Sequence, residues 1–482
     1  MAPAFLIQPL PEAANTGAEA VFWALATGTP APTYQWNFNG VAIPGATGPL
    51  FAEANVQASN AGSYSVTVMN SAGSVTSSGA ALTVNSSTTG NPPAFKGQPI
   101  SQTIANGTTV AFSALAGGTI GVTTSIARAV APPDSGNAES PQASSTPSYQ
   151  WFWNGNAISG ATDSTYVLYG ATAANDGSYT CVATNSSGAV ESGAATLNVV
   201  SNPNPGRLVD LSCRAQVGTG ANQLITGFVV GGSGTSGTQP LLVRASGPAL
   251  APFGVTNDLP DPELTINGSA GVLATNNGWG GNALVASTAN LVGAFAWNVP
   301  SSHDSAVVNS LAEGAYTAQI IGASGDTGVA LAEVYDATPV GSYASTSPRL
   351  INLSARNQVG AGGNILIAGF VIGGTTSKTV LIRASGPALA QFGLSGTLPD
   401  PALQLYQANA NGSSTLVQSD TGWGGDPTIA SAAADVGAFS WGGAATADSA
   451  ILVTLPPGAY TAEVSGASGD TGLALVEVYD VQ

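Results

Sequence analysis

The chain has 482 residues, enough for roughly three to four domains, and only 7% of them are charged, against roughly 25% in an ordinary soluble protein. Its 26 acidic residues outnumber 9 basic ones, so phosphate backbones and anionic lipid surfaces would repel the net charge of −17. No run approaches the roughly 18 apolar residues of a membrane-spanning helix, and we expect neither a nucleic-acid partner nor membrane insertion.

The first 200 residues contain one sequence pattern twice. The two copies are 90 residues apart at their starts and 115 residues apart further on, so the second copy carries an insertion at about residues 119–147. The recurring segments are 3–5, 34–36 and 62–64, which reappear at 93–95, 149–151 and 177–179. Such self-similarity indicates two structural units of the same kind.

Both copies resemble immunoglobulin-like (Ig-like) domains of the kind found in series along bacterial surface proteins. The resemblance is carried by a tryptophan expected on the third strand, Trp36 or Trp151, and by Tyr64 or Tyr179 at the place of a tyrosine corner. It implies a β-sandwich for each copy. It implies little about function, because this fold serves many roles.

Neither copy can form the disulfide that joins the two sheets of antibody domains. The two half-cystine positions hold Ala24 with Val66 in the first copy and Ala114 with Cys181 in the second. Each core must therefore depend on packing around its tryptophan. The other cysteine, Cys213, falls in a different predicted domain, so we interpret both cysteines as buried thiols.

The insertion in the second copy begins with an alternating stretch that includes Ile120, Val122 and Ile126. Alternation is typical of a strand, and a loose strand could add to a sheet edge of a neighbouring molecule. These three residues are therefore candidate assembly residues. The alternative is a mobile surface loop, because the rest of the insertion has the composition of a flexible chain.

The remaining chain contains a second, closer pair of copies. The segments that begin at Arg207 and Arg349 are nearly identical, and each copy contains one RASGPAL, one GWGG and one GASGDTG motif. Alternating stretches such as 224–228 and 316–320 predict strands, GASGDTG predicts the turn of a closing hairpin, and no helix is expected. The repeat resembles a domain found in tandem near the C-termini of large secreted bacterial proteins, which implies a jelly-roll-like β-sandwich.

The predicted fold is therefore all-β, with four tandem β-sandwich domains, two Ig-like and two jelly-roll-like. Short junctions that contain proline separate the domains and should make the chain semi-rigid. The domains are predicted at 1–86, 92–201, 206–338 and 348–482.

Six of the seven arginines occupy matched positions of the two C-terminal copies, which indicates a structural task in a chain so poor in charge. They are Arg207, Arg214 and Arg244, matched by Arg349, Arg356 and Arg383. We predict ion pairs of Arg244 with Glu333 and of Arg383 with Glu477, because a guanidinium suits a partly buried carboxylate. The alternative is a carboxylate-lined ligand site.

No arrangement of residues predicts catalysis. The single histidine, His303, is adjacent to Asp304 and Ser305, and neighbours on a strand point to opposite faces, so these three cannot form a catalytic relay. The second copy has Ala447 in place of His303. One histidine and two distant cysteines also cannot build a zinc site. We therefore predict no enzyme and no cofactor, with calcium as the one possible ligand ion.

Calcium could bind through Asp326 and Asp470 in the two GASGDTG motifs, because carboxylate oxygens are among its preferred ligands. No EF-hand spacing accompanies them. Aspartate also serves in turns on its own account, and this is the alternative.

The GWGG motifs place Trp279 and Trp423 between glycines. An indole face left open there could stack on a sugar, which would make both tryptophans glycan-binding residues. Alternatively, each tryptophan closes the end of its own sandwich.

These expectations favour a non-catalytic structural protein that is secreted or held at the cell surface. Low charge lets neutral surfaces pack, and sheet edges without charge are weakly guarded against pairing, so the expected partner is the chain itself in a homopolymer. The protein would then be the subunit of a surface fibre, sheath or layer. There are two alternatives: an adhesin or carbohydrate-binding module for surface glycans, and spacer domains of a larger secreted enzyme.

Overall fold

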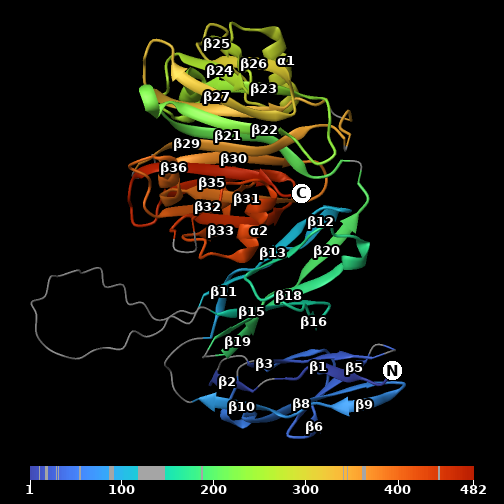
Figure 1. The fold of residues 1–482 in the computed structure, drawn as a ribbon. Coiled ribbons are helices and arrows are strands. Elements are labelled where there is room, and N and C mark those ends of the chain that lie inside the picture. Colours follow the sequence, from blue (N-terminus) through green and yellow to red (C-terminus); the bar gives the residue numbers. More distant parts are fainter. Residues whose placement is uncertain are drawn as a thin grey trace, which may run out of the picture. The chain divides into compact units, whose positions relative to one another are not determined.

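A computed structural model shows an all-β protein whose described residues include two short α-helices, and the prediction of tandem β-sandwiches is confirmed (Figure 1). The structure describes residues 1–482 except 10, 17–19, 29, 31, 54–55, 86–91, 118–146, 186–187, 203, 340, 345, 361–364 and 443–445. This part forms two compact units. The first comprises Met1–Ser101, Phe112–Tyr166 and Asp176–Leu197, and the second comprises Gln102–Ala111, Val167–Asn175 and Asn198–Gln482.

The first Ig-like domain is a sandwich of short strands. These are β1 (Ala4–Ile7), β2 (Glu12–Asn15), β3 (Ala20–Trp23), β4 (Leu25–Thr27), β5 (Thr33–Phe38), β6 (Val41–Ala42), β7 (Leu50–Glu53), β8 (Gly62–Asn70), β9 (Gly73–Thr76) and β10 (Ala80–Asn85). The larger sheet has the order β2-β10-β8-β5-β6, with β9 beside β8. The pairs β1 with β4 and β3 with β7 complete the domain.

An aromatic core takes the place of the missing disulfide. Trp36 is fully buried, and its Nε1 donates a hydrogen bond to the carbonyl of Gly48 at 3.0 Å. Phe22 stacks on Tyr64 with 4.5 Å between the ring centroids. The Tyr64 hydroxyl donates to the carbonyl of Asn60, four residues upstream, at 3.0 Å, which is the geometry of a tyrosine corner.

The second Ig-like domain repeats this pattern. Its strands are β11 (Ala94–Gly97), β12 (Gln102–Ala105), β13 (Val110–Ser113), β14 (Leu115–Gly117), β15 (Ser148–Trp153), β16 (Asn156–Ala157), β17 (Thr165–Leu168), β18 (Gly177–Asn185), β19 (Gly188–Glu191) and β20 (Ala195–Val200). β18 pairs with β15, β19 and β20. Trp151 is fully buried and donates to the carbonyl of Asp163, and Phe112 stacks on Tyr179.

Each C-terminal repeat supplies eight strands, one α-helix and one six-residue 3-10 helix. The first contains β21 (Arg207–Val217), β22 (Leu224–Gly231), β23 (Thr238–Ser246), η4 (Pro248–Phe253), β24 (Pro262–Gly268), β25 (Gly271–Asn276), α1 (Ala283–Val292), β26 (Ser305–Ala312), β27 (Gly314–Gly322) and β28 (Gly328–Asp336). The second contains β29 (Arg349–Val359), β30 (Leu366–Gly373), β31 (Lys378–Ser385), η5 (Pro387–Phe392), β32 (Pro401–Ala408), β33 (Ser414–Asp420), α2 (Pro427–Asp435), β34 (Ser449–Leu455), β35 (Gly458–Gly466) and β36 (Gly472–Asp480).

The sixteen strands of the two repeats form two rows, and each row contains four strands from each repeat. One row has the order β25-β24-β27-β22-β29-β36-β31-β34. The other has the order β33-β32-β35-β30-β21-β28-β23-β26. The repeats therefore join twice, where β22 pairs with β29 and where β21 pairs with β30 (Figure 1).

The two junctions repeat one another in register. The same residue types meet in both: Gly227 with Ser354 and Ile225 with Arg356 in one, Gly369 with Ser212 and Ile367 with Arg214 in the other. One hydrophobic core contains residues of both repeats. The sequence predicts a separate sandwich for each repeat, whereas the structure joins the two side by side, because the first two strands of each repeat pair with those of the other.

The prediction that the chain has no helix is wrong. α1 begins after Asn282, whose side chain accepts hydrogen bonds from the backbone of Leu284 and Val285. α2 begins after Asp426 in the same way. Both capping residues come shortly after a GWGG motif, and such caps stabilise a helix start by satisfying its free N–H groups. The helices are only 10 and 9 residues long, too short for a clear apolar period.

The GASGDTG motif is not the turn of a hairpin, and this prediction is also wrong. It links β27 to β28 and β35 to β36, and in each case the two strands belong to different rows. The motif therefore carries the chain from one layer of the sandwich to the other. Its central glycines, Gly325 and Gly469, do adopt positive φ, at 80° and 79°, as expected of a tight turn.

Candidate functional site

Four outward-facing residues lie side by side across the junction of the two repeats. Gly227 on β22, Ser354 on β29, Glu477 on β36 and Arg383 on β31 are in register with one another. The residue that follows each of them belongs to the hydrophobic core. Because side chains alternate along a strand, this row faces away from the core. The other junction has an equivalent row, with Gly369 from the second repeat and Ser212, Glu333 and Arg244 from the first.

The structure brings together the two predicted ion pairs in these rows. Arg383 and Glu477 are 1% and 4% exposed, and Nη1 of the arginine lies 3.6 Å from Oε2 of the glutamate. Arg244 and Glu333 are buried to the same degree, with 3.1 Å between Nε and Oε2. The two residues of each pair lie on adjacent strands of the same repeat. A charge buried this deeply requires a partner, because desolvation of an isolated charge is very costly.

Aromatic rings enclose each buried arginine. The guanidinium carbon of Arg383 lies 4.5 Å from the ring centroid of Phe439 and 4.3 Å from that of Trp441. Its Nη2 donates to the carbonyl of Phe439 at 2.9 Å. Arg244 has the same contacts with Phe295 and Trp297. These cation–π contacts replace part of the hydration that the arginine loses.

The glutamates are held by hydroxyl donors. Burial raises the pKa of the Glu477 carboxyl, and Arg383 and the Tyr479 hydroxyl oppose that rise. The Tyr479 hydroxyl donates to Oε1 of Glu477 at 2.6 Å. Oε2 of Glu477 lies buried without a hydrogen-bond donor among the described residues, whereas Oε2 of Glu333 accepts from Ser246 at 3.1 Å. The two repeats therefore differ at this oxygen.

A buried aspartate fixes the 3-10 helix that covers the ion pair. Oδ1 of Asp448 accepts hydrogen bonds from the backbone N of Gly386 at 2.7 Å and of Ala388 at 3.3 Å. The backbone of Gly386 also lies against Leu398, and a Cβ at this position would collide with the Leu398 carbonyl oxygen. Only glycine fits there.

We expect Gly386→Ala to lower the free energy of unfolding by about 3 kcal/mol, because the added methyl meets backbone that cannot turn away. Denaturant unfolding followed by tryptophan fluorescence measures the loss. Gly442→Ala is the control, since a Cβ there has open space and no positive φ. Equal stability of the two variants would contradict the close approach of Gly386 to Leu398.

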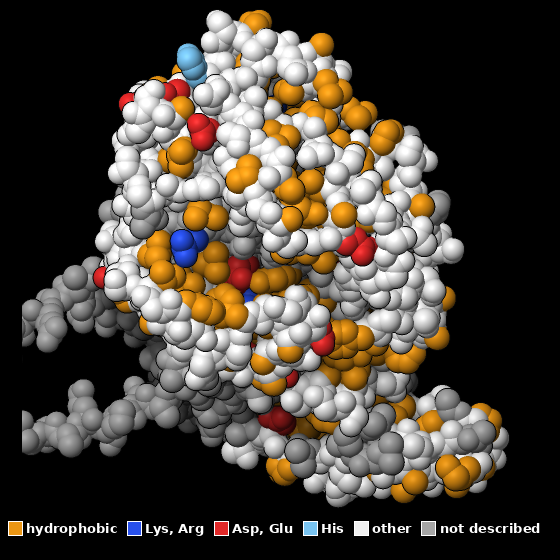
Figure 2. All heavy atoms as spheres, turned by 45° about the horizontal axis from the view of Figure 1, so that its top comes forward, with side chains coloured by type: hydrophobic (Ala, Val, Ile, Leu, Met, Phe, Trp, Pro, Cys, Tyr) orange, Lys and Arg blue, Asp and Glu red, His pale blue; other side chains and the backbone are white. Residues whose placement is uncertain are grey.

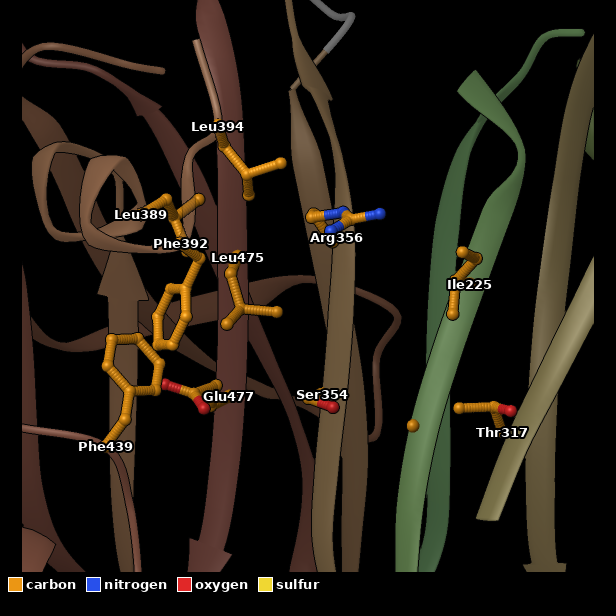
Figure 3. A pocket seen from close by; sticks show the side chains of 11 residues that line it. Ile225, Thr317, Ser354, Arg356, Leu389, Phe392, Leu394, Phe439, Leu475 and Glu477 are labelled. Carbon is orange, nitrogen blue, oxygen red and sulfur yellow. The ribbon is translucent and has the colours of Figure 1, made fainter. Parts of the chain in front are cut away.

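A pocket of about 460 Å³ opens on the outward face beside Glu477 (Figure 3). On one side it is lined by Leu389 and Phe392 of η5, and by Phe439. On the other side lie residues of the first repeat, Ile225 and Thr317. Its base is the strand row described above, and Arg356 lines it from β29 (Figure 3). The pocket thus exists because the repeats share a sheet.

Arg214 and Arg356 differ from the other arginines that the structure describes. Arg207 and Arg349 pair with Asp336 and Asp480, and the two buried arginines pair as above. Arg214 and Arg356 have no ion pair with any described residue, although they occupy equivalent positions beside the two junctions. Sequence reasoning identified them as matched but assigned them no role. The sequence offered no signal for this difference, because the two repeats share five matched pairs of acids, more than enough to pair with every matched arginine.

The two GWGG tryptophans lie against the body of their own repeats. Trp279 is 8% exposed, forms an edge-to-face contact with Trp297 at 5.6 Å, and donates to Ser302 at 3.1 Å. Trp423 is half-buried and makes the equivalent contact with Trp441. This placement matches the alternative in which each tryptophan closes a sandwich, and it leaves little of the Trp279 ring for a sugar.

Asp326 and Asp470 lie in the exposed loops between the two rows of strands. Neighbouring aspartates hold these loops, since Asp261 accepts from Ser324 and Asp400 from Ser468. Within the described ranges, no group of three His, Cys, Asp or Glu side chains is placed to hold a metal ion.

His303 is exposed, whereas its neighbours are buried and bonded elsewhere. Asp304 accepts from the backbone of Gly247, and Ser305 donates to the carbonyl of Pro262. Cys181 and Cys213 are free thiols, and burial raises the pKa of each to about 12. A thiol with so high a pKa is a poor nucleophile at neutral pH. The candidate assembly residues Ile120, Val122 and Ile126 lie outside the described residues.

Among the comparisons with known proteins, only the comparison with solved structures finds matches, and those reported below contain Ig domains. No protein-family model matches the chain, and no curated protein matches it. The N-terminal Ig1-2 module of the Drosophila receptor protein tyrosine phosphatase DLAR is 22% identical over 42% of this chain and 100% of that chain, with a TM-score of 0.27. A chimeric titin Z1Z2 tandem is 24% identical over 41% and 100%, with a TM-score of 0.20. Immunoglobulin domains 1–4 of Sidekick-1 are 17% identical over 42% and 49%, with a TM-score of 0.17.

Identities and TM-scores this low add nothing to the strand order and aromatic cores, on which the Ig-like description of the first two domains rests. No helix in the described part of the chain is long and apolar enough to cross a membrane. Because no family model and no curated protein matches the chain, the site is interpreted from its own chemistry.

Proposed function

We propose that the protein is a secreted or surface-held structural subunit that assembles with copies of itself into a fibre, sheath or layer. The observation that carries this proposal is a pair of exposed strands, β25 and β33, at opposite ends of the joined sandwich. Each ends one row of strands and pairs on one side only among the described strands. Such an edge offers free N–H and C=O groups to another chain.

These two edges are weakly protected against pairing. β25 contains no charged residue or proline, and β33 contains one charge, Asp420, at its end. Both edges expose an apolar side chain at the equivalent position, Val272 at 66% and Leu416 at 49%. Because the edges lie at opposite ends, pairing between them would extend the sheet from molecule to molecule without closing it.

The placement of the charges also supports assembly through neutral surfaces. Four of the arginines pair inside their own repeat, and Lys378 pairs with Asp480 there as well. Few charged side chains are visible on the face in Figure 2, where hydrophobic side chains border a hollow. On a surface of this kind, few individual charges oppose close contact between copies, and the long-range repulsion comes from the net negative charge.

Negative-stain electron microscopy and sedimentation of the full chain test the proposal. We expect ordered polymers, and we expect Val272→Lys with Leu416→Lys to leave single chains, because two charged edges repel and must be desolvated to pair. The matched control is Val299→Lys with Leu284→Lys, which adds the same charge at sites that are exposed by 55% and 59% and belong to neither edge strand. Wild-type protein that stays monomeric at high concentration, or edge variants that polymerise normally, would overturn the proposal.

A further inference from the structure

We propose that the pocket of the second repeat binds a small carboxylic acid with an aromatic body and a hydroxyl group at its far end. This inference is independent of assembly. It rests on the unpaired Arg356, on the apolar walls, and on the buried Glu477 oxygen that lacks a donor.

Arg356 supplies the contact for a carboxylate. An arginine fork binds carboxylates through charge-assisted hydrogen bonds, and no described residue occupies this one. Arg356 lines the pocket beside Leu475 and is half-buried, so its interaction with an anion is screened less than on an open surface.

Glu477 supplies the contact for the opposite end of the ligand. Glu477 lines the pocket, and its buried Oε2 accepts no hydrogen bond from a described residue, although Arg383 lies 3.6 Å away and offsets its charge. A hydroxyl of the ligand would donate to this oxygen. Ser354, the register partner of Glu477, is two residues from Arg356, which separates the two polar contacts by roughly 7 Å along the strand. One aromatic ring between carboxylate and hydroxyl matches this separation.

The walls favour an aromatic body. Phe392 is 57% exposed at the rim and contacts Phe439 edge to face, with 5.1 Å between ring centroids. Leu389 and Leu475 complete this wall. A ring placed here would bury apolar surface and could contact the Phe392 ring edge to face or offset.

Charges nearby distinguish the pocket from its equivalent in the first repeat. Across the strands, Arg356 is in register with Ile225 and then with the neutral Gln319 on β27. At the other junction, Arg214 is in register with Ile367 and then with Glu463 on β35. Asn352 is the register partner of Tyr479, close to Glu477. The equivalent position of the first repeat holds Asp210, whose Oδ1 is buried. The equivalent site beside Arg214 therefore has two additional acidic residues, Glu463 of the second repeat and Asp210 of the first, and Glu463 would repel an anion, so we assign binding to the pocket beside Arg356.

A titration of the full chain with 4-hydroxyphenylacetate, followed by ligand-observed NMR, tests the inference. We expect saturable binding with a dissociation constant of about a millimolar or tighter. Arg356→Gln should weaken it about 10- to 100-fold, and the methyl ester of the probe should lose as much on wild-type protein. Phenylacetate, which lacks the hydroxyl, should bind several-fold more weakly.

Arg214→Gln is the matched control, because it makes the same change at the equivalent position, and it should change the constant less than twofold. Gln319→Glu copies the acid of the first repeat and should weaken binding several-fold. Circular dichroism checks that each variant is folded. Absence of saturable binding, normal binding by Arg356→Gln, or an equal loss in Arg214→Gln would each overturn the inference, whether or not the protein polymerises.

Discussion

The second repeat produced alone, as residues 348–482, is expected to form a homodimer. Without the first repeat, β29 and β30 lose the strands that they pair with at the two junctions. The central residues of these junctions are equivalent in the two repeats, so β29 of one copy can pair with β30 of another, twice, around a two-fold axis. The dimer would thereby rebuild the joined sandwich and its shared core.

Sedimentation equilibrium and light scattering measure the mass of this fragment. A mass twice that of the fragment is expected at micromolar concentration, and the two-repeat fragment 206–482 is the control that should remain a single chain unless its outer edges pair. Adding Leu416→Lys to the single repeat separates edge pairing from junction pairing, because it leaves the junction intact. A folded, monomeric single repeat would show that the junctions are not required for its stability.

Arg383→Met is expected to lower the free energy of unfolding by about 3–5 kcal/mol, because it leaves the carboxylate of Glu477 buried without its counter-charge. The variant also loses the hydrogen bond to Phe439 and the contacts with two aromatic rings. Denaturant unfolding of the two-repeat fragment 206–482 reports the change.

Two further variants show whether the buried charge causes that loss of stability. Arg383→Met combined with Glu477→Leu should recover all but about 1 kcal/mol, since an apolar pair of similar volume needs no charge compensation. Arg356→Gln should change stability by less than about 0.5 kcal/mol, because this arginine has no ion pair among the described residues. If the double variant were as unstable as the single one, packing around Arg383 rather than the buried charge would explain the effect.

Local patterns in the sequence predicted much of the fold. The spacing of Trp36 and Tyr64, and of Trp151 and Tyr179, predicted the Ig-like cores, because each of these positions can be recognised from the few residues around it. Arg383 and Glu477 could be matched as candidates because few charges exist in the chain and both recur in the other repeat.

The pairing between repeats could not be predicted in the same way. Alternation along β22 or β29 indicates which side chains face a core, but it does not identify the strand on either side. The pocket draws residues from six separate segments, among them Thr317 and Phe439, so it appears only once the strand order is known. The helices carried one usable signal, the capping residues Asn282 and Asp426, which come just after GWGG.

The strand order also determines how the joined repeats would respond to a mechanical load. The first strand of the pair, β21, lies between β28 and β30, and the last, β36, lies between β29 and β31. A pull along the backbone at either strand therefore acts on two hydrogen-bonded ladders at once, in shear. Neither strand can be peeled from a free edge, so tension applied at either strand would have to break two ladders together rather than one hydrogen bond at a time.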